Sequence, residues 1–174
     1  MTNNLFSFLA WPTEYPFIIT QPFGANPDNY RQFYYDDRGH QGVDFRAYAG
    51  TRIYCVAAGQ VKMVCYEKLA RVDGGHNFGI HCRVAHFGCY ETIYCHLQSL
   101  TVEVGDLVSA GYTLGLADST GNSRGSHLHL HLKDYGRVID PTPFIIELEY
   151  MIRSSELLQP DFGGEGGIRT HDQA

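Results

Sequence analysis

Short stretches in which hydrophobic and polar residues alternate fill the middle of the chain. An alternation with a period of two, interrupted by turns rich in glycine, is typical of strands in an antiparallel sheet. Strands are predicted on this basis at residues 43–45, 52–58, 59–65, 79–86, 90–95, 102–106, 108–115 and 127–133. We therefore predict a mainly β protein, in which a small antiparallel sheet forms a sandwich or a barrel.

The periodicity changes from strand-like to helix-like near the C-terminal end. The sequence Asp140-Pro141-Thr142-Pro143 is typical of a helix start, and a helical apolar stripe follows it at Phe144, Ile145, Leu148, Met151 and Ile152. This spacing predicts a short closing helix that ends before Pro160. The organisation expected from these patterns is a lead-in at 1–18, one domain at 19–147, the rest of the closing helix at 148–160 and a disordered tail at 161–174.

Composition and charge narrow the function classes. The 174 residues fit one domain, and 44% hydrophobic with 18% charged residues excludes a disordered or fibrous chain. The net charge of −6 argues against binding to nucleic acid or to an anionic membrane surface. No stretch reaches the ~20 apolar residues of a membrane span, and the apolar run at 5–11 lacks the basic residues of a secretory signal. We expect a monomer that is made in the cytoplasm and does not insert into membranes.

The five cysteines are odd in number and form no Cys-x-x-Cys pair. We interpret them as buried free thiols, with a disulfide or a zinc–thiolate site as the alternative. They are Cys55, Cys65, Cys82, Cys89 and Cys95.

The chain has nine histidines, and five of them fall into patterns that suit metal chemistry. His40 and Asp44 are four residues apart, which places both on one face of a strand or a helix. The alternation His127-Leu128-His129-Leu130-His131 sends three imidazoles to one face of a strand, and chance would produce such a triple only about 0.02 times in this chain. His96 follows a predicted strand. Imidazole and carboxylate together suit zinc, although each residue could instead be a surface or strand-end polar group.

Several short motifs occur in a fixed order along the chain. They are Gly39-His40-x-Gly-Val-Asp44, Tyr94-x-His96-Leu97, Val104-Gly105-Asp106-x-Val108, Ser119-Thr120-Gly121 and Gly125-x-His127-Leu128-His129. Together they resemble the lysostaphin/LytM-type zinc metallopeptidases over residues 19–144. The resemblance implies a small antiparallel β domain of the duplicated hybrid-motif type, with a groove walled by loops. It also implies that residues 19–147 are a zinc peptidase catalytic domain that cuts stem peptides or cross-bridges of bacterial peptidoglycan.

The resemblance also assigns roles to the polar residues. It implies that His40, Asp44 and His129 bind one Zn²⁺ ion and that His96 and His127 are the catalytic histidines; spacing alone would allow His127 and His129 to exchange roles. A tyrosine that assists the oxyanion would be Tyr34 or Tyr35, and the choice between them is open. His131 stands where the family usually has an acidic residue, so we expect it to contact a ligand or line the groove.

The chemistry expected from these residues is peptide hydrolysis. Three protein ligands leave a fourth zinc position open for water, whose pKa falls to about 7, while two further imidazoles can act as general base or stabilise the oxyanion. The alternatives are an inactive LytM-like binding or regulatory module, which would have lost zinc ligands, and a hybrid-motif carrier domain, whose carrier lysine is missing here.

The biological role predicted from the sequence is that of a phage endolysin or virion-associated lysin, because no export signal or wall-binding module is evident. Such an enzyme acts on the cell wall after release. The bond it cuts is open at this stage: a D-alanine–diaminopimelate cross-link, a stem-peptide bond or a glycine bridge.

Overall fold

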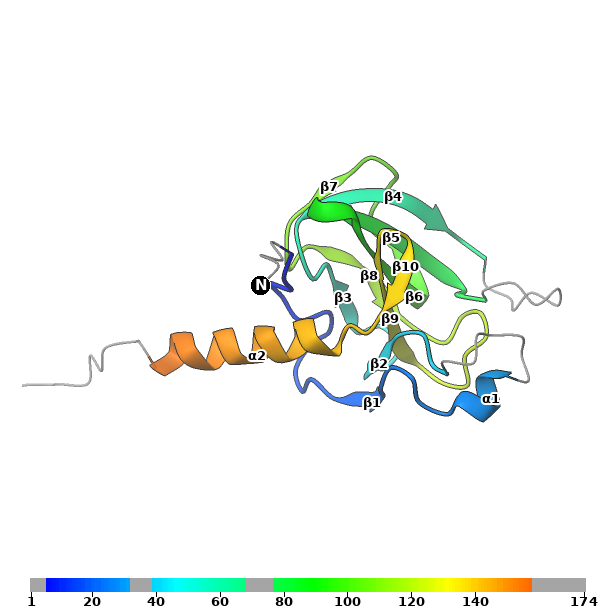
Figure 1. Cartoon of the computed structure of the whole chain (residues 1–174). Helices are drawn as coiled ribbons and strands as arrows, with labels where there is room; N and C mark the ends of the chain where they lie inside the picture. The colour runs from blue at the N-terminus through cyan, green and yellow to red at the C-terminus, as the bar shows by residue number, and fades with distance from the viewer. Residues whose placement is uncertain (1–5, 32–38, 68–76, 158–174) are drawn as a thin grey trace, which may run out of the picture.

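The computed structural model describes residues 6–31, 39–67 and 77–157 of the chain, and these form ten strands, two α-helices and one short 3₁₀ turn (Figure 1). The strands are β1 (Ile19–Gln21), β2 (Val43–Arg46), β3 (Arg52–Tyr54), β4 (Gly59–Cys65), β5 (Ile80–His86), β6 (Tyr90–Leu100), β7 (Leu107–Val108), β8 (Thr113–Ala117), β9 (His127–Asp134) and β10 (Arg137–Ile139). The helices are α1 (Pro27–Arg31) and α2 (Thr142–Leu157), and the turn is Phe87–Cys89. The mainly β, antiparallel fold predicted from the alternation is confirmed.

Strand β6 organises the sheet because it pairs with three other strands. The main path of the sheet runs β1-β2-β9-β6-β5-β4-β7, and every pairing in it is antiparallel. Residues 90–95 of β6 pair with β9, whereas residues 97–100 pair with β8. The change of partner takes place at His96, where the regular ladder is interrupted.

The hydrophobic core lies on the inner face of these strands. The three leucines of β9, Leu128, Leu130 and Leu132, are fully buried, as the alternation of the histidine-rich segment predicts. The lead-in also contributes to the core, because Phe8 is fully buried and its ring lies 5.5 Å from that of Phe144 in α2. The described residues before β1 therefore pack against the folded domain.

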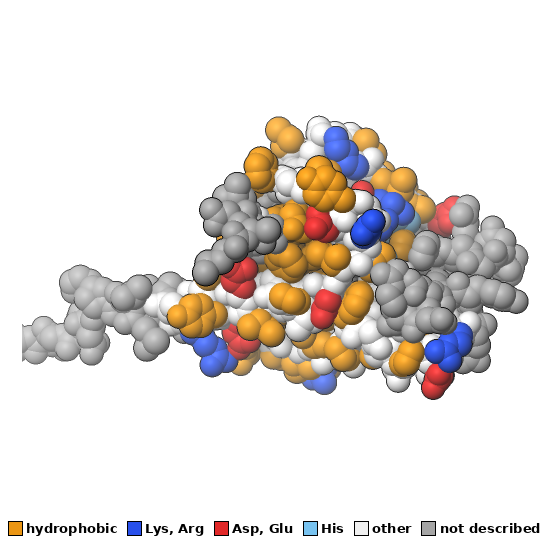
Figure 2. Space-filling model, viewed as in Figure 1, with side chains coloured by type: hydrophobic (Ala, Val, Ile, Leu, Met, Phe, Trp, Pro, Cys, Tyr) orange, Lys and Arg blue, Asp and Glu red, His pale blue; other side chains and the backbone are white. Residues whose placement is uncertain are grey.

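Helix α2 begins where the sequence predicts. The amide of Thr142 donates a hydrogen bond to the carboxylate of Asp140, which satisfies one of the free donors at the helix start. Phe144, Ile145 and Leu148 are buried against the sheet, and the helix then projects from the domain (Figure 1). Figure 2 shows orange hydrophobic side chains mixed with charged ones over this face. The predicted tail at 161–174 lies outside the described residues.

The five cysteines carry free thiols, so the disulfide alternative is not supported. Cys55, Cys82 and Cys95 are buried as expected, whereas Cys65 is half-buried. The expectation of burial is wrong for Cys89, which is exposed because it lies in the turn between β5 and β6. Among the described residues, none of the helices has the length and hydrophobicity needed to cross a membrane.

Replacing Phe8 with alanine should lower the free energy of unfolding by about 3–5 kcal/mol, because a large ring fully enclosed by the core is lost. Urea denaturation measures this. Leu9→Ala is the matched control: Leu9 is 61% exposed, and its loss should change stability by less than about 0.5 kcal/mol. Equal effects of the two substitutions would mean that the lead-in is not part of the core.

Candidate metal centre

The pairing of β2 with β9 places the polar residues of both strands on one face. Asp44 lies directly opposite His129, and Arg46 lies directly opposite His127. Residues opposite each other in an antiparallel ladder point to the same side of the sheet, and so do residues two apart on one strand. The four side chains therefore share the face that is turned away from the buried leucines of β9.

Three atoms on this face converge within hydrogen-bonding distance of one another. Asp44 Oδ1 lies 2.9 Å from His129 Nδ1 and 3.1 Å from His40 Nε2, and the two nitrogens are 2.9 Å apart. Tetrahedral zinc with ligands at 2.0–2.2 Å would separate its ligand atoms by roughly 3.3 Å, close to this arrangement. No other three His, Cys, Asp or Glu side chains in the described part of the chain form such a group, and this one contains no thiol.

The protonation of the group suits a cation. Nδ1 of His40 lies 3.1 Å from the carbonyl oxygen of Pro22, which can only accept a hydrogen bond. The proton therefore sits on Nδ1, and Nε2 keeps the lone pair that a metal requires. Burial would raise the pKa of Asp44, but its contacts with His129, at 2.9 Å, and with His40, at 3.1 Å, outweigh burial and hold the pKa well below its usual range. Burial lowers the pKa of His129 despite the nearby carboxylate. At neutral pH Asp44 is therefore an anion and His129 a neutral imidazole.

A glycine and an aromatic ring fix the position of His129. A Cβ atom at Gly42 would lie 2.6 Å from Cε1 of His129 and 2.6 Å from the carbonyl oxygen of Leu130. Only glycine leaves room for the imidazole at this point. The ring of Phe78 stacks on that of His129 with centroids 6.1 Å apart. His131, which is 1% exposed, lies against the same two rings at 5.9 Å from His129 and 5.8 Å from Phe78.

His96 reaches the same face through an irregularity in β6. Cys95 pairs with His129 and therefore shares its face of the sheet. Strict alternation would place the next residue, His96, on the opposite face. Instead its φ of 63° lies in the left-handed region, and the imidazole lies 4.8 Å from that of His127 and 5.9 Å from that of His129. The expectation that His96 follows the end of a strand is wrong: the strand continues to Leu100. Backbone strain of this kind is often found at functional sites.

The Ser-Thr-Gly segment holds His96 in place. Nδ1 of His96 donates to the carbonyl oxygen of Thr120 at 2.7 Å. The Thr120 hydroxyl donates to the carbonyl oxygen of Leu97 and accepts from the amide of Ile80. Gly121 has a φ of 75°, and a Cβ there would lie 2.3 Å from the backbone nitrogen of Gly79. The close contact of these two loops therefore requires glycine.

The imidazoles of His96 and His127 are oriented in the same way. Nδ1 of His127 donates to the carbonyl oxygen of Gly125 at 2.8 Å, so its Nε2 carries a lone pair, and this nitrogen lies 3.6 Å from Asp44 Oδ1. Burial, followed by the neighbouring His129 and His127, lowers the pKa of His96 to about 3. His96 is therefore neutral near pH 7. The structure brings all five residues, from His40 to His129, to one point.

A groove of about 720 Å³ runs over this group, lined by β1, α1, β2 and the loops at 77–78 and 122–126. Tyr30 and Tyr48 line it, and the Tyr30 hydroxyl accepts a hydrogen bond from Gln21 Nε2 at 2.9 Å. Sequence reasoning missed both tyrosines, because neither belongs to a motif. The predicted tyrosines Tyr34 and Tyr35 lie outside the described residues.

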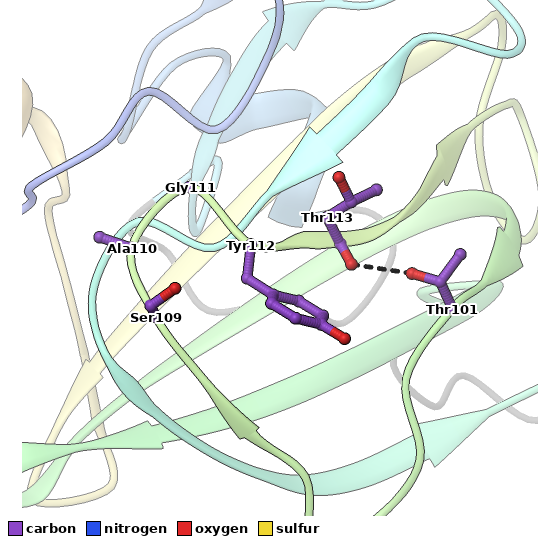
Figure 3. A pocket seen from close by; sticks show the side chains of 6 residues that line it. All are labelled: Thr101, Ser109, Ala110, Gly111, Tyr112 and Thr113. Carbon is purple, nitrogen blue, oxygen red and sulfur yellow. Dashed lines mark hydrogen bonds between the residues drawn. The ribbon is translucent and has the colours of Figure 1, made fainter.

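A second hollow of about 560 Å³ lies at the loop between β7 and β8, around Tyr112 (Figure 3). Its wall is tied by a hydrogen bond of 2.8 Å from the Thr101 hydroxyl to the carbonyl oxygen of Thr113. No acid, base or thiol lines it, so it offers no comparable chemistry. Its lining residues are Thr101, Ser109, Ala110, Gly111, Tyr112 and Thr113.

Comparison with known proteins places the described motifs in one family. Residues 38–141 match the model of Peptidase family M23. Peptidoglycan DD-endopeptidase ShyA of Vibrio cholerae is 31% identical over 120 residues, which is 69% of this chain and 26% of ShyA. Glycyl-glycine endopeptidase ALE-1 of Staphylococcus capitis is 31% identical over 133 residues, which is 74% of this chain and 32% of ALE-1. The chain spans between 22% and 33% of the length of these curated relatives and of others that it matches.

A solved structure agrees with this match. The crystal structure of a zinc-containing peptidase from Vibrio cholerae superposes with a TM-score of 0.64 and 28% identity, covering 78% of this chain and 39% of that one.

The close contact at Gly42 leads to a prediction about the metal group. In Gly42→Ala the added methyl would displace the imidazole of His129 or the β9 backbone, so the free energy of unfolding should fall by about 1–3 kcal/mol. Zinc affinity, measured by calorimetry, should fall with it. In the matched control Gly125→Ala the new Cβ meets no atom within 4 Å, and both quantities should stay close to wild type. An unchanged zinc affinity in Gly42→Ala would contradict the role given to this glycine.

Proposed function

Because this chain belongs to peptidase family M23, we propose that it is a zinc-dependent endopeptidase that hydrolyses peptide bonds of bacterial peptidoglycan. The observation that carries the proposal is the convergence of His40 Nε2, Asp44 Oδ1 and His129 Nδ1 within 3.1 Å of one another, under two further imidazoles. The similarity to ShyA, a peptidoglycan DD-endopeptidase, supports the substrate class.

We assign the metal to His40, Asp44 and His129, because their three donor atoms match the ligand set of catalytic zinc. Bound zinc supplies a Lewis acid for the scissile carbonyl and a water of lowered pKa. Asp44 contributes the negative charge that favours a divalent cation in this buried setting. The carbonyl of Pro22 keeps the ligating nitrogen of His40 free of a proton.

His96 and His127 are assigned to proton transfer. Both donate from Nδ1 to a backbone carbonyl, so both present an Nε2 lone pair that can accept a proton from the attacking water. The protonated imidazole can then donate to the leaving amine. The carbonyls of Thr120 and Gly125 fix each ring, so no reorientation is needed when the proton moves.

The proposed substrate is a stem peptide or cross-bridge, and the proposed place of action is the cell wall. The metal group is complete, which argues against the alternative of an inactive binding module. The alternative of a carrier domain does not explain why the histidines converge. The role in a phage and the monomeric state stay predictions.

Single substitutions should separate the two classes of residue. Alanine at His40, Asp44 or His129 should remove zinc together with activity, since each loss leaves only two protein ligands. Alanine at His96 or His127 should retain about one zinc per chain and lower the rate by roughly 10²–10⁴-fold. Plasma mass spectrometry of the purified variants measures the zinc, and release of muropeptides from purified cell walls measures the rate.

His131→Ala is the control on the same strand. Its imidazole contacts His129 without belonging to the metal group, so this variant should retain zinc and part of the activity. If His127→Ala loses zinc while His129→Ala keeps it, the roles of the two residues are reversed. Activity that survives complete removal of metal by a chelator would contradict the proposal as a whole.

A further inference from the structure

The groove contains very few charged side chains. Apart from Asp44 in the metal group, the described residues that line it contribute two groups with a fixed charge, Arg46 and Arg124. The other lining residues are amides, hydroxyls, aromatic rings and the imidazoles. In the described part of the groove, the charged side chains beside the metal group are therefore positive, although the net charge of the protein is −6.

Arg46 is placed by the same ladder that builds the metal group. It lies two residues after Asp44 on β2 and directly opposite His127 on β9. Its Cα is therefore about 6.6–6.8 Å along the strand from that of Asp44, on the same face. Arg46 is exposed at the edge of the groove. Its distance from the metal group is about the length of one or two residues of an extended peptide substrate.

Arg124 is presented by a loop that also holds His127. The Ser123 hydroxyl donates to the carbonyl oxygen of Gly125, and that same carbonyl accepts the proton of His127 Nδ1. On the preceding side, the amide of Asn122 donates to the carbonyl of Asn77 at 2.9 Å. Arg124 thus extends from a loop that is fixed on both sides.

Neither guanidinium has an ion pair or a side-chain hydrogen bond with any described residue, whereas four other arginines of this chain have carboxylate partners. Arg52 pairs with Glu14 at 2.7 Å, and Arg83 lies 3.7 Å from Glu91. Arg31 and Arg153 also have carboxylate partners. The two groove arginines are available for a ligand.

We propose that Arg46 and Arg124 bind a free carboxylate of the peptide substrate and so make this chain selective for acidic stem peptides. Stem peptides carry carboxylates beside their peptide bonds, whereas the interior of a glycine bridge carries none. A guanidinium binds a carboxylate through paired, charge-assisted hydrogen bonds, which a neutral bridge cannot form. This inference rests on the proposed function and deepens it. Overall sequence identity does not distinguish a stem peptide from a glycine bridge as the substrate, because ShyA and ALE-1 are each 31% identical to the chain.

The test uses three synthetic peptides and the zinc-loaded full chain. Two are cross-linked stem peptides that differ only in the glutamate α-carboxyl group, which is free in one and a carboxamide in the other; the third is pentaglycine. Wild type should cleave the free carboxylate peptide with a kcat/KM roughly 10- to 100-fold above that for the carboxamide. This ratio should shrink as salt is added, since both arginines are exposed.

Substitution should remove the preference. In Arg46→Gln, Arg124→Gln and the double variant, the ratio of the two kcat/KM values should fall, reaching about 1 in the double variant. Replacement of both arginines by lysine should restore part of it, because lysine keeps the charge without the planar fork. The matched control is Arg137→Gln, an exposed arginine of β10 outside the groove, which should keep the full ratio.

The outcomes separate the two proposals. Equal cleavage of both stem peptides, faster cleavage of pentaglycine, or a preference that survives in the double glutamine variant would overturn the selectivity while leaving the peptidase proposal in place. A zinc-loaded wild type that cleaves none of the peptides and releases nothing from purified peptidoglycan would overturn both.

Discussion

The register between β2 and β9 is the constraint on which the rest of the site depends. It places Asp44 opposite His129 and Arg46 opposite His127 while the leucines of β9 fill the core. A slip of one residue would exchange the two faces, burying imidazoles among hydrophobic side chains and exposing the leucines. The burial of these leucines therefore fixes the register that assembles the metal group. A change that weakened the packing of β9 in the core would also disturb the geometry of the site.

Backbone carbonyl groups determine which ring nitrogen carries the proton in three of the histidines of the site. Pro22, Thr120 and Gly125 each accept a hydrogen bond from an imidazole Nδ1. Each bond fixes both the tautomer and the orientation of a ring, so that Nε2 faces the groove. Because carbonyl groups carry no net charge, the metal group retains a single negative charge, that of Asp44, and a divalent cation bound there would keep a net positive charge.

Sequence periodicity predicted most of the strands, the closing helix and the shared face of the histidines, because alternation has a direct geometric meaning. The predicted strand at 102–106 is wrong, since that segment is a turn, and the short strands β1 and β10 were missed. It could not place His96, whose left-handed backbone breaks that same alternation. It also missed Tyr30 and Tyr48, which reach the groove through loops and strand ends far from any motif. Contacts between segments distant in sequence, such as Gly79 with Thr120, leave no periodic signal in either segment.

The separation of the ligands along the chain has a consequence for biosynthesis. His40 and Asp44 come early, and 85 residues separate Asp44 from its partner His129 on β9. A nascent chain that has been synthesised only as far as β6 contains one imidazole and the carboxylate of the metal group without their third partner. The complete ligand set therefore arises only after β9 has emerged and paired with β2.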